Sequence, residues 1–233
     1  MKIKMSNEDS VPKSNSEKPN KIPEEGNPSS PTPLQRFEAS MQIGFEEWHD
    51  GIGYDVAAIK LASKAELDAI EQILINHRPR DWRDIEALAE INTKCARETI
   101  KEAINNPNPI IRVAVTRFAP DLITDNERSQ SIIYALQKTE IFSGFSNVLD
   151  EVEKYHPKEV KEALIKGLLN RKGDVAVHFA AMLLYLFGET KEPFDWKQRP
   201  FFLRFNTEDR KERVEVFREL CQKLKINPEK YLP

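Results

Sequence analysis

Apolar side chains recur every three or four positions along most of the chain, which is the spacing of an amphipathic α-helix. Two of these stretches begin with a capping box, Ser63 with Glu66 and Thr124 with Glu127, and Asp81 can cap a third. Alternating runs of β-branched residues, which are typical of strands, are scarce. The residues that can end or separate the helices are Pro107, Pro109, Pro120, Pro157 and Gly188. We therefore predict an all-α protein.

The C-terminal part of the chain departs from this simple pattern. The stretch from Val175 to Phe187 is apolar on nearly all sides, which is typical of a helix buried between others. Residues 193 to 206 are rich in aromatic side chains, and we expect this segment to be irregular. The last predicted helix is amphipathic, and its apolar positions are Val214, Phe217, Cys221 and Leu224.

Three blocks of similar length form a degenerate internal repeat: Cys95 to Ala119, Glu127 to His156 and Lys158 to Gly188. Each block consists of a predicted helix, a short polar or proline-bearing turn and a second predicted helix. The starts of successive blocks are 32 and 31 residues apart. A period of this size is typical of helix pairs that stack on one another.

The turn of the first block, Asn108-Pro109-Ile110-Ile111-Arg112, resembles the Asp-Pro-x-Val-Arg element of HEAT and HEAT-like repeats. In that family the first residue caps the second helix of a pair, and the arginine follows a buried β-branched residue. The third block keeps this form over residues 173 to 178, with His178 in the place of the arginine. The middle block departs from it, because residues 140 to 144 contain neither proline nor arginine.

The resemblance covers residues 95 to 188 and extends back to Tyr54 as one more helix pair. It implies a HEAT-like α-α superhelix of about four helix pairs over residues 34 to 233, with a capping helix at the C-terminus. In that family the concave face of the stack most often binds another protein. We expect Arg112 to bridge adjacent repeats through a carboxylate or a carbonyl; the alternative is an outward-facing role on the groove. We expect His178 to be a hydrogen-bonded core residue rather than a ligand.

Residues 1 to 33 have a different composition from the rest of the chain. They hold six of the fifteen prolines and six serines, and few large apolar residues. Such a segment cannot bury enough apolar surface to offset the roughly 1–2 kcal/mol per residue that ordering its backbone costs. We therefore predict a disordered N-terminal tail.

The overall charge restricts the kind of partner. The chain has 35 Lys and Arg against 38 Asp and Glu, a net charge of −3, whereas a protein held to nucleic acid by phosphate contacts needs a basic face. No run reaches the roughly 20 apolar residues that cross a bilayer, and the start lacks the apolar segment of a secretory signal. Two cysteines, Cys95 and Cys221, suit a reducing compartment and are expected to be buried. We expect a cytoplasmic protein that does not enter a membrane.

The densest group of polar and aromatic residues precedes the predicted repeats. Its binding candidates are Trp48, His49, Asp50, Tyr54 and Asp55. His49 with Asp50 or Asp55 could serve as a base with an orienting acid, but no second histidine follows at a helical spacing, so we expect no metal. The alternative is structural: Gly51 and Gly53 permit a bend, an aspartate caps the next helix, and the large rings cover the end of the stack.

A second candidate segment runs from Phe194 to Phe205, with five aromatic residues and three cations. Its binding candidates are Trp196, Arg199 and Arg204. Interleaved aromatic and basic side chains can anchor a protein partner or stack on bases. The alternative is that the aromatic rings cap the core of the last repeat, because a solenoid must cover its terminal apolar face.

Motifs for nucleotide phosphates, for a serine nucleophile elbow and for zinc are absent from the sequence, so we expect no cofactor. We expect a non-catalytic module that binds another protein, as an adaptor, an inhibitor or an immunity- or antitoxin-type protein. The alternative is an enzyme similar to the DNA glycosylases built on HEAT-like stacks, which use tryptophans and an aspartate. The residues for that role would be Trp48, Asp50, Trp82 and Trp196. A continuous basic groove would favour the enzyme, and a mixed or acidic lining would favour the binding module.

Overall fold

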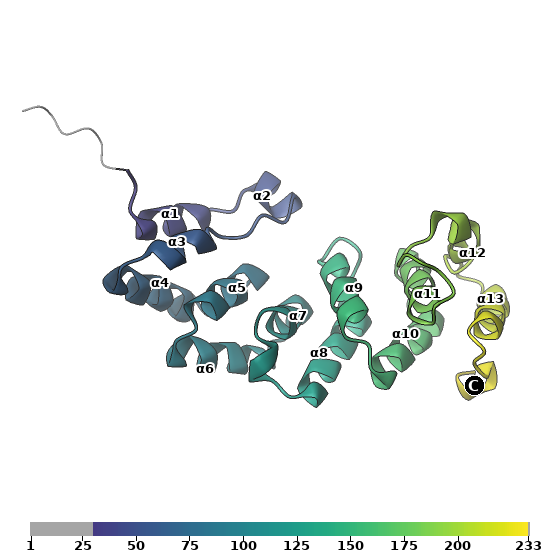
Figure 1. Ribbon diagram of the computed structural model, residues 1–233. Coiled ribbons are helices and arrows are strands. Elements are labelled where there is room, and N and C mark those ends of the chain that lie inside the picture. The colour runs from purple at the N-terminus through teal and green to yellow at the C-terminus, as the bar shows by residue number, and fades with distance from the viewer. Residues whose placement is uncertain (1–29, 233) are drawn as a thin grey trace, which may run out of the picture. The chain divides into compact units, whose positions relative to one another are not determined.

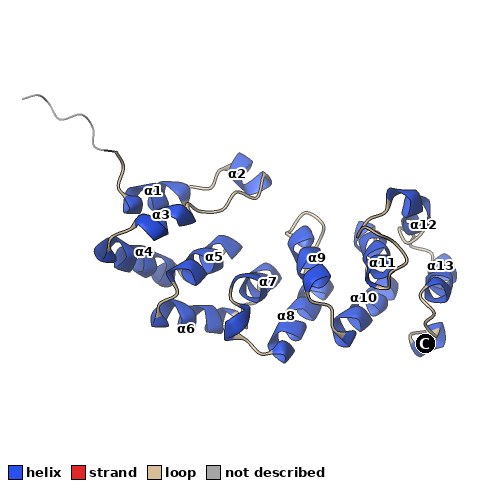
Figure 2. Cartoon of the chain, viewed as in Figure 1, coloured by secondary structure: helices blue, strands red, loops and turns tan. Residues whose placement is uncertain are grey.

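The computed structural model describes residues 30–232, and all regular structure within that range is helical (Figure 2). The prediction of an all-α fold is therefore confirmed. Residues 1–29 of the predicted disordered tail lie outside the described residues. The folded unit begins at Thr32, which caps the first helix, and extends to the C-terminus.

The described residues contain thirteen α-helices and three 3₁₀ helices. The α-helices, labelled in Figure 1, are α1 (Pro33–Ser40), α2 (Phe45–His49), α3 (Val56–Leu61), α4 (Lys64–His77), α5 (Trp82–Ile91), α6 (Lys94–Ala103), α7 (Pro109–Phe118), α8 (Asp125–Lys138), α9 (Phe145–Lys154), α10 (Lys158–Asn170), α11 (Asp174–Leu186), α12 (Arg199–Leu203) and α13 (Arg210–Lys223). The 3₁₀ helices are η1 (Pro120–Leu122), η2 (Trp196–Gln198) and η3 (Pro228–Lys230).

Helices α4 to α11 form four pairs joined by short turns: α4 with α5, α6 with α7, α8 with α9, and α10 with α11. The second helices pack on one another in chain order, α5 on α7, α7 on α9 and α9 on α11 (Figure 1). Among the first helices, α4 packs on α6 and α8 on α10, and α13 covers α10. The three predicted blocks correspond to the last three pairs, and the fourth pair precedes them.

The predicted start and stop signals act where the sequence places them. Ser63 and Thr124 accept hydrogen bonds from the backbone N–H of Glu66 and Glu127, at 3.4 and 3.2 Å, and each glutamate reaches back to complete the capping box. Asn108 caps α7, which has a proline at its first position, where the missing N–H costs no hydrogen bond. Local chemistry alone therefore explains where many of these helices begin.

Two apolar clusters make up the core. One joins residues from α1 to α7 and the other joins residues from α7 to the C-terminus. Helix α7 contributes to both: Ile111 and Val115 lie in the first cluster and Val113 in the second, and all three are at most 2 % exposed. The two clusters therefore meet through a single shared helix.

Arginines bind the backbone carbonyls at the turns of the pairs. Arg112 donates from Nε to the carbonyl of Asn106 (2.6 Å), and its guanidinium lies 4.0 Å from the ring centroid of Tyr134 on α8. Arg112 therefore contacts the adjacent pair, as we expected, but through a cation–π contact with Tyr134. The carbonyl that it binds, that of Asn106, belongs to its own pair. Arg171 makes a true bridge, because it donates to the carbonyls of Leu136 (3.2 Å) and Thr139 (2.7 Å) in the preceding pair.

The C-terminal aromatic segment is more regular than we predicted, because it contains η2 and α12. Phe202 and Phe205 are fully buried in the C-terminal cluster, so these two rings cover the end of the core, as the structural alternative for this segment predicted.

The prediction that both cysteines are buried is half wrong. Cys95 is exposed, whereas Cys221 is buried, and burial raises the pKa of its thiol to about 11.

His178 does not make the hydrogen bond that we expected, as none joins its ring to the other described residues. Instead the imidazole is half-buried between the rings of Phe145 and Phe194, at centroid distances of 5.9 and 5.1 Å. Desolvation lowers its pKa below 6.5, and the charge of Asp174 opposes this effect. An aromatic environment of this kind favours the neutral imidazole.

Gly167 is required because α10 and α11 approach closely. A Cβ at this position would lie 2.4 Å from Cε2 of the buried Phe179. We predict that Gly167→Ala lowers the free energy of unfolding, because overpacking costs about 1–3 kcal/mol and the better helix propensity of alanine returns at most about 1 kcal/mol. Urea denaturation measures the change. In the double variant Gly167→Ala/Phe179→Leu the penalty should shrink, and strict additivity would contradict the explanation.

The environment of His178 predicts a dependence of stability on pH. Because the pKa of the folded state is lowered, the contribution of the neutral imidazole is complete above about pH 6.5 and is lost as the pH falls below that value. We expect His178→Leu to lose less stability than the wild type between about pH 7.5 and about pH 5 in thermal denaturation. If His178→Leu loses as much stability as the wild type over this range, the explanation is contradicted.

Candidate functional site

A groove of about 1110 Å³ opens between the N-terminal helices and the middle of the repeat unit. Four segments line it: residues 48–54 at the end of α2 and in the loop after it, residues 80–86 at the start of α5, both ends of α7, and the turn from α8 into α9. We call it the α2–α9 groove. It lies on the side of the second helices of the pairs, where α5, α7 and α9 pack in succession.

Arg83 fixes the segment that forms one wall of the groove. The side chain is 1 % exposed, and it donates from Nε to the carbonyl of Ile52 (2.6 Å) and from Nη2 to the carbonyl of Glu47 (3.2 Å). Nη1 pairs with Asp81 at 3.0 Å. All the hydrogen-bonding nitrogens of Arg83 are thus engaged internally, and α2 with its following loop is held against α5. The conformation of Gly51, with φ of +66°, makes the bend that we expected in this loop.

A buried carboxylate organises the base of the same wall. Asp84 is 1 % exposed and accepts hydrogen bonds from the hydroxyl of Tyr54 (3.1 Å) and from the backbone N–H of Arg80 (2.8 Å). Nε2 of His77 lies 3.1 Å from the same carboxylate. Burial and the charge of Asp84 raise the pKa of Tyr54 far above its usual 10, so the phenol stays protonated and donates to the carboxylate.

Aromatic side chains line both sides of the groove. Trp82 stacks on Phe118, with ring centroids 6.2 Å apart and an interplanar angle of 12°. Trp48 is 54 % exposed on α2, and Phe142 is 89 % exposed in the turn between α8 and α9. Large apolar side chains that stay exposed around a concave surface are typical of sites that bind a partner.

Acidic and basic residues are present in equal number in the groove. The charged side chains that line it are Asp50, Asp81, Glu86, Arg80, Arg83 and Arg117. His49, beside them, has Nδ1 2.9 Å from Asp50 in an exposed position. Burial raises the pKa of Glu86 above its ordinary value, and the charges of Arg117 and Arg83 oppose that effect. The lining is therefore mixed rather than continuously basic.

The structure separates the residues that the sequence proposed as one binding set. Trp48, His49, Asp50 and Tyr54 line the α2–α9 groove. Asp55 does not: it caps α3, accepting from the N–H of Ala58 (3.0 Å), and pairs with Arg36 at 2.6 Å. The structural alternative for this segment predicted that an aspartate caps the next helix, and Asp55 confirms that part of it.

The C-terminal candidates lie outside the groove. Trp196 is 70 % exposed, and the guanidinium of Arg199 lies 5.4 Å from its ring centroid. Arg204 forms a two-armed ion pair with Glu219 on α13, at 2.5 and 2.7 Å. Of the four residues considered for a glycosylase-like role, Trp48, Asp50 and Trp82 share the groove and Trp196 does not.

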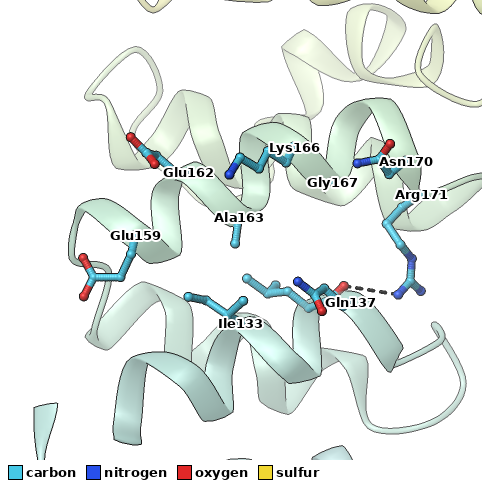
Figure 3. Close-up of a pocket in the computed structure, with 10 residues that line it drawn as sticks. Ile133, Gln137, Glu159, Glu162, Ala163, Lys166, Gly167, Asn170 and Arg171 are labelled. Carbon is cyan, nitrogen blue, oxygen red and sulfur yellow. Dashed lines mark hydrogen bonds between the residues drawn. The ribbon is translucent and has the colours of Figure 1, made fainter. Parts of the chain in front are cut away.

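A smaller crevice of about 460 Å³ lies between α8 and α10 (Figure 3). Its floor is apolar, and Figure 3 shows Ile133 on α8 and Ala163 on α10 pointing into it. Its rim is polar, and at one end Arg171 closes it with the hydrogen bond to Leu136. Glu162 on the rim is paired with Lys230 at 2.7 Å.

Comparison with protein-family models, with curated proteins and with solved structures gave no match. Between residues 30 and 232, no group of three or more histidine, cysteine or carboxylate side chains is placed to hold a metal ion. Within the same range no helix is both long and apolar enough to cross a membrane. The case for a functional site is therefore made from the residues that line the α2–α9 groove.

Replacement of Arg83 tests whether it holds the groove wall. We predict that Arg83→Met lowers the free energy of unfolding by about 1–3 kcal/mol, because the carbonyl of Ile52 loses its donor, whereas that of Glu47 keeps the hydrogen bond from the N–H of Ile52. Chemical denaturation followed by tryptophan fluorescence measures the loss. Arg80→Met removes the same charge from an exposed neighbour and should change stability by less than about 0.5 kcal/mol. Equal effects of the two substitutions would contradict this role for Arg83.

Proposed function

We propose that this chain is a non-catalytic, HEAT-like helical-repeat module that binds a protein partner in the α2–α9 groove. The observation that carries the proposal is the exposure of Trp48 and Phe142 in one groove with balanced charge. Aromatic residues dominate the energetics of protein interfaces, where a few buried anchors supply most of the affinity. A partner that covered these rings would remove a large apolar area from water.

The HEAT-like assignment is supported by the turn of the α6–α7 pair. Asn108 caps α7, Pro109 takes its first position, and Arg112 reaches back to the carbonyl of Asn106. The regular packing of α5, α7, α9 and α11 supports it as well. A stack of this type binds through an extended surface and needs no catalytic group.

The charge of the groove favours a protein over a nucleic acid. Three acids and three arginines line it, so a polyanion would meet as much repulsion as attraction. Binding without chemistry is how adaptors, inhibitors and immunity- or antitoxin-type proteins work, and we place this chain in that class. Its two free cysteines suit the reducing environment of the cytoplasm.

Selection of binding peptides tests the proposal directly. The intact chain is immobilised and a random-peptide library is displayed against it. For the selected peptides we expect Trp48→Ala/Phe142→Ala to weaken binding by about tenfold or more, because loss of an anchor costs upwards of 1 kcal/mol. Trp196→Ala removes a ring outside the groove whose exposure, 70 %, lies between those of Trp48 and Phe142, and should leave binding unchanged.

Two results would contradict the proposal. One is a set of peptides whose affinity is the same for the groove variant and the wild type. The other is tight binding of a DNA duplex carrying an abasic-site analogue that is lost in Asp50→Asn, which would favour the glycosylase-like enzyme. Circular dichroism and melting temperature establish that each variant is folded.

A further inference from the structure

Glu86 differs from the other charged residues of the α2–α9 groove. Asp50 is within 2.9 Å of His49, Arg80 donates to His77 (2.6 Å), and Asp81 pairs with Arg83 (3.0 Å). Arg117 donates to the side chain of Asn147 at 3.3 Å. Glu86 has neither a hydrogen bond nor an ion pair with any of the described residues.

The carboxylate of Glu86 lies in a confined place. A Cβ at Gly53 would be 2.9 Å from its Oε2 and 3.7 Å from Cη2 of Trp82, so the loop after α2 passes close to both side chains. The side chain is half-buried. A carboxylate that is partly removed from water and has no partner loses hydration without compensation. A ligand that supplies donors would remove that deficit.

The charges near Glu86 limit what such a ligand can be. Arg83 and Arg117 are the nearby cations, and Glu90 is the nearby acid. Each guanidinium nitrogen of Arg83 is hydrogen-bonded to Ile52, Glu47 or Asp81, and among the described residues no ion pair joins Arg83 to Glu86. Arg117 is exposed and lies on the groove, and its charge lowers the pKa of Glu86, but among the described residues no ion pair joins the two side chains. The position opposite Glu86 is therefore open to a cationic group that approaches through the groove.

We propose that Glu86 receives a basic side chain, lysine or arginine, from the protein partner of the groove. This inference rests on the proposed function. The carboxylate accepts charge-assisted hydrogen bonds from the ammonium or guanidinium group, and these are stronger than neutral ones. The aromatic rings that line the groove add attraction for a cation. The partner thus presents a segment in which a basic residue accompanies the apolar residues that cover Trp48 and Phe142.

The three tryptophans of the chain provide the readout. Trp48 and Trp82 line the groove and Trp196 lies outside it, so their indole N–H signals report binding and supply an internal control. We would titrate the ¹⁵N-labelled full chain with the blocked peptides acetyl-Gly-Arg-Gly-amide, acetyl-Gly-Lys-Gly-amide and acetyl-Gly-Glu-Gly-amide. The basic peptides should shift the signals of Trp82 and Trp48, and the acidic peptide should shift neither.

Three substitutions locate the cation. Glu86→Gln keeps the shape of the side chain and should weaken binding of the basic peptides about tenfold, the size expected for loss of a charged hydrogen bond. Arg117→Gln removes the competing cation and should strengthen binding a few-fold. Glu90→Gln makes the same charge change one turn along α5, on a residue paired with Lys60 at 3.5 Å, and should weaken binding much less than Glu86→Gln.

The inference is overturned if the acidic peptide binds as well as the basic ones, or if Glu86→Gln and Glu90→Gln weaken binding equally. Its failure is distinguishable from failure of the proposed function. If the displayed peptides require Trp48 and Phe142 but bind the Glu86→Gln variant as well as the wild type, the protein-binding role is supported and the role of Glu86 is contradicted. The opposite outcome is that the displayed library yields no groove binder, although the basic peptides bind in a way that depends on Glu86. That result would support the cation site and contradict the proposed protein-binding role.

Discussion

The burial of apolar faces between successive helices is the interaction on which this structure depends. The described α-helices have between 5 and 14 residues, and helices of that length are marginal in water by themselves. The helices of the four pairs become stable by packing on their partners and on the helices of the adjacent pairs. The backbone of α5, α7 and α9 is thereby fixed, and these helices carry much of the lining of the groove.

Arginines provide the polar counterpart to that packing. Carbonyl groups are left without partners where the chain turns between helices. Arg83, Arg112 and Arg171 each direct donors to such carbonyls, and Arg213 does so for Leu168 near the C-terminus. Because a guanidinium offers five donors in a rigid fork, one side chain can serve two segments at once. These residues contribute to the architecture although they are charged.

The sequence predicted the features that depend on neighbouring residues. The capping box of Ser63 and the proline-bearing start of α7 are local, so their outcomes could be read from the spacing alone. The groove could not be predicted in this way. Arg83 binds the carbonyl of Ile52, 31 residues away, and nothing in the pattern distinguishes it from an exposed arginine. The same holds for Phe142, whose neighbourhood is created by the stacking of α7 and α9.

The shared position of α7 has a consequence for the way in which a partner would act on the molecule. Tyr54, Trp82 and Phe118 pack against the N-terminal apolar cluster, whereas Ile110 and Ile141 pack against the C-terminal one, and all five line the groove. A partner seated there would brace the two halves across their joint. A ligand that binds only the folded state opposes unfolding. Because both apolar clusters contribute to the groove, a bound partner would stabilise both of them, and the two halves of the stack would unfold in one transition.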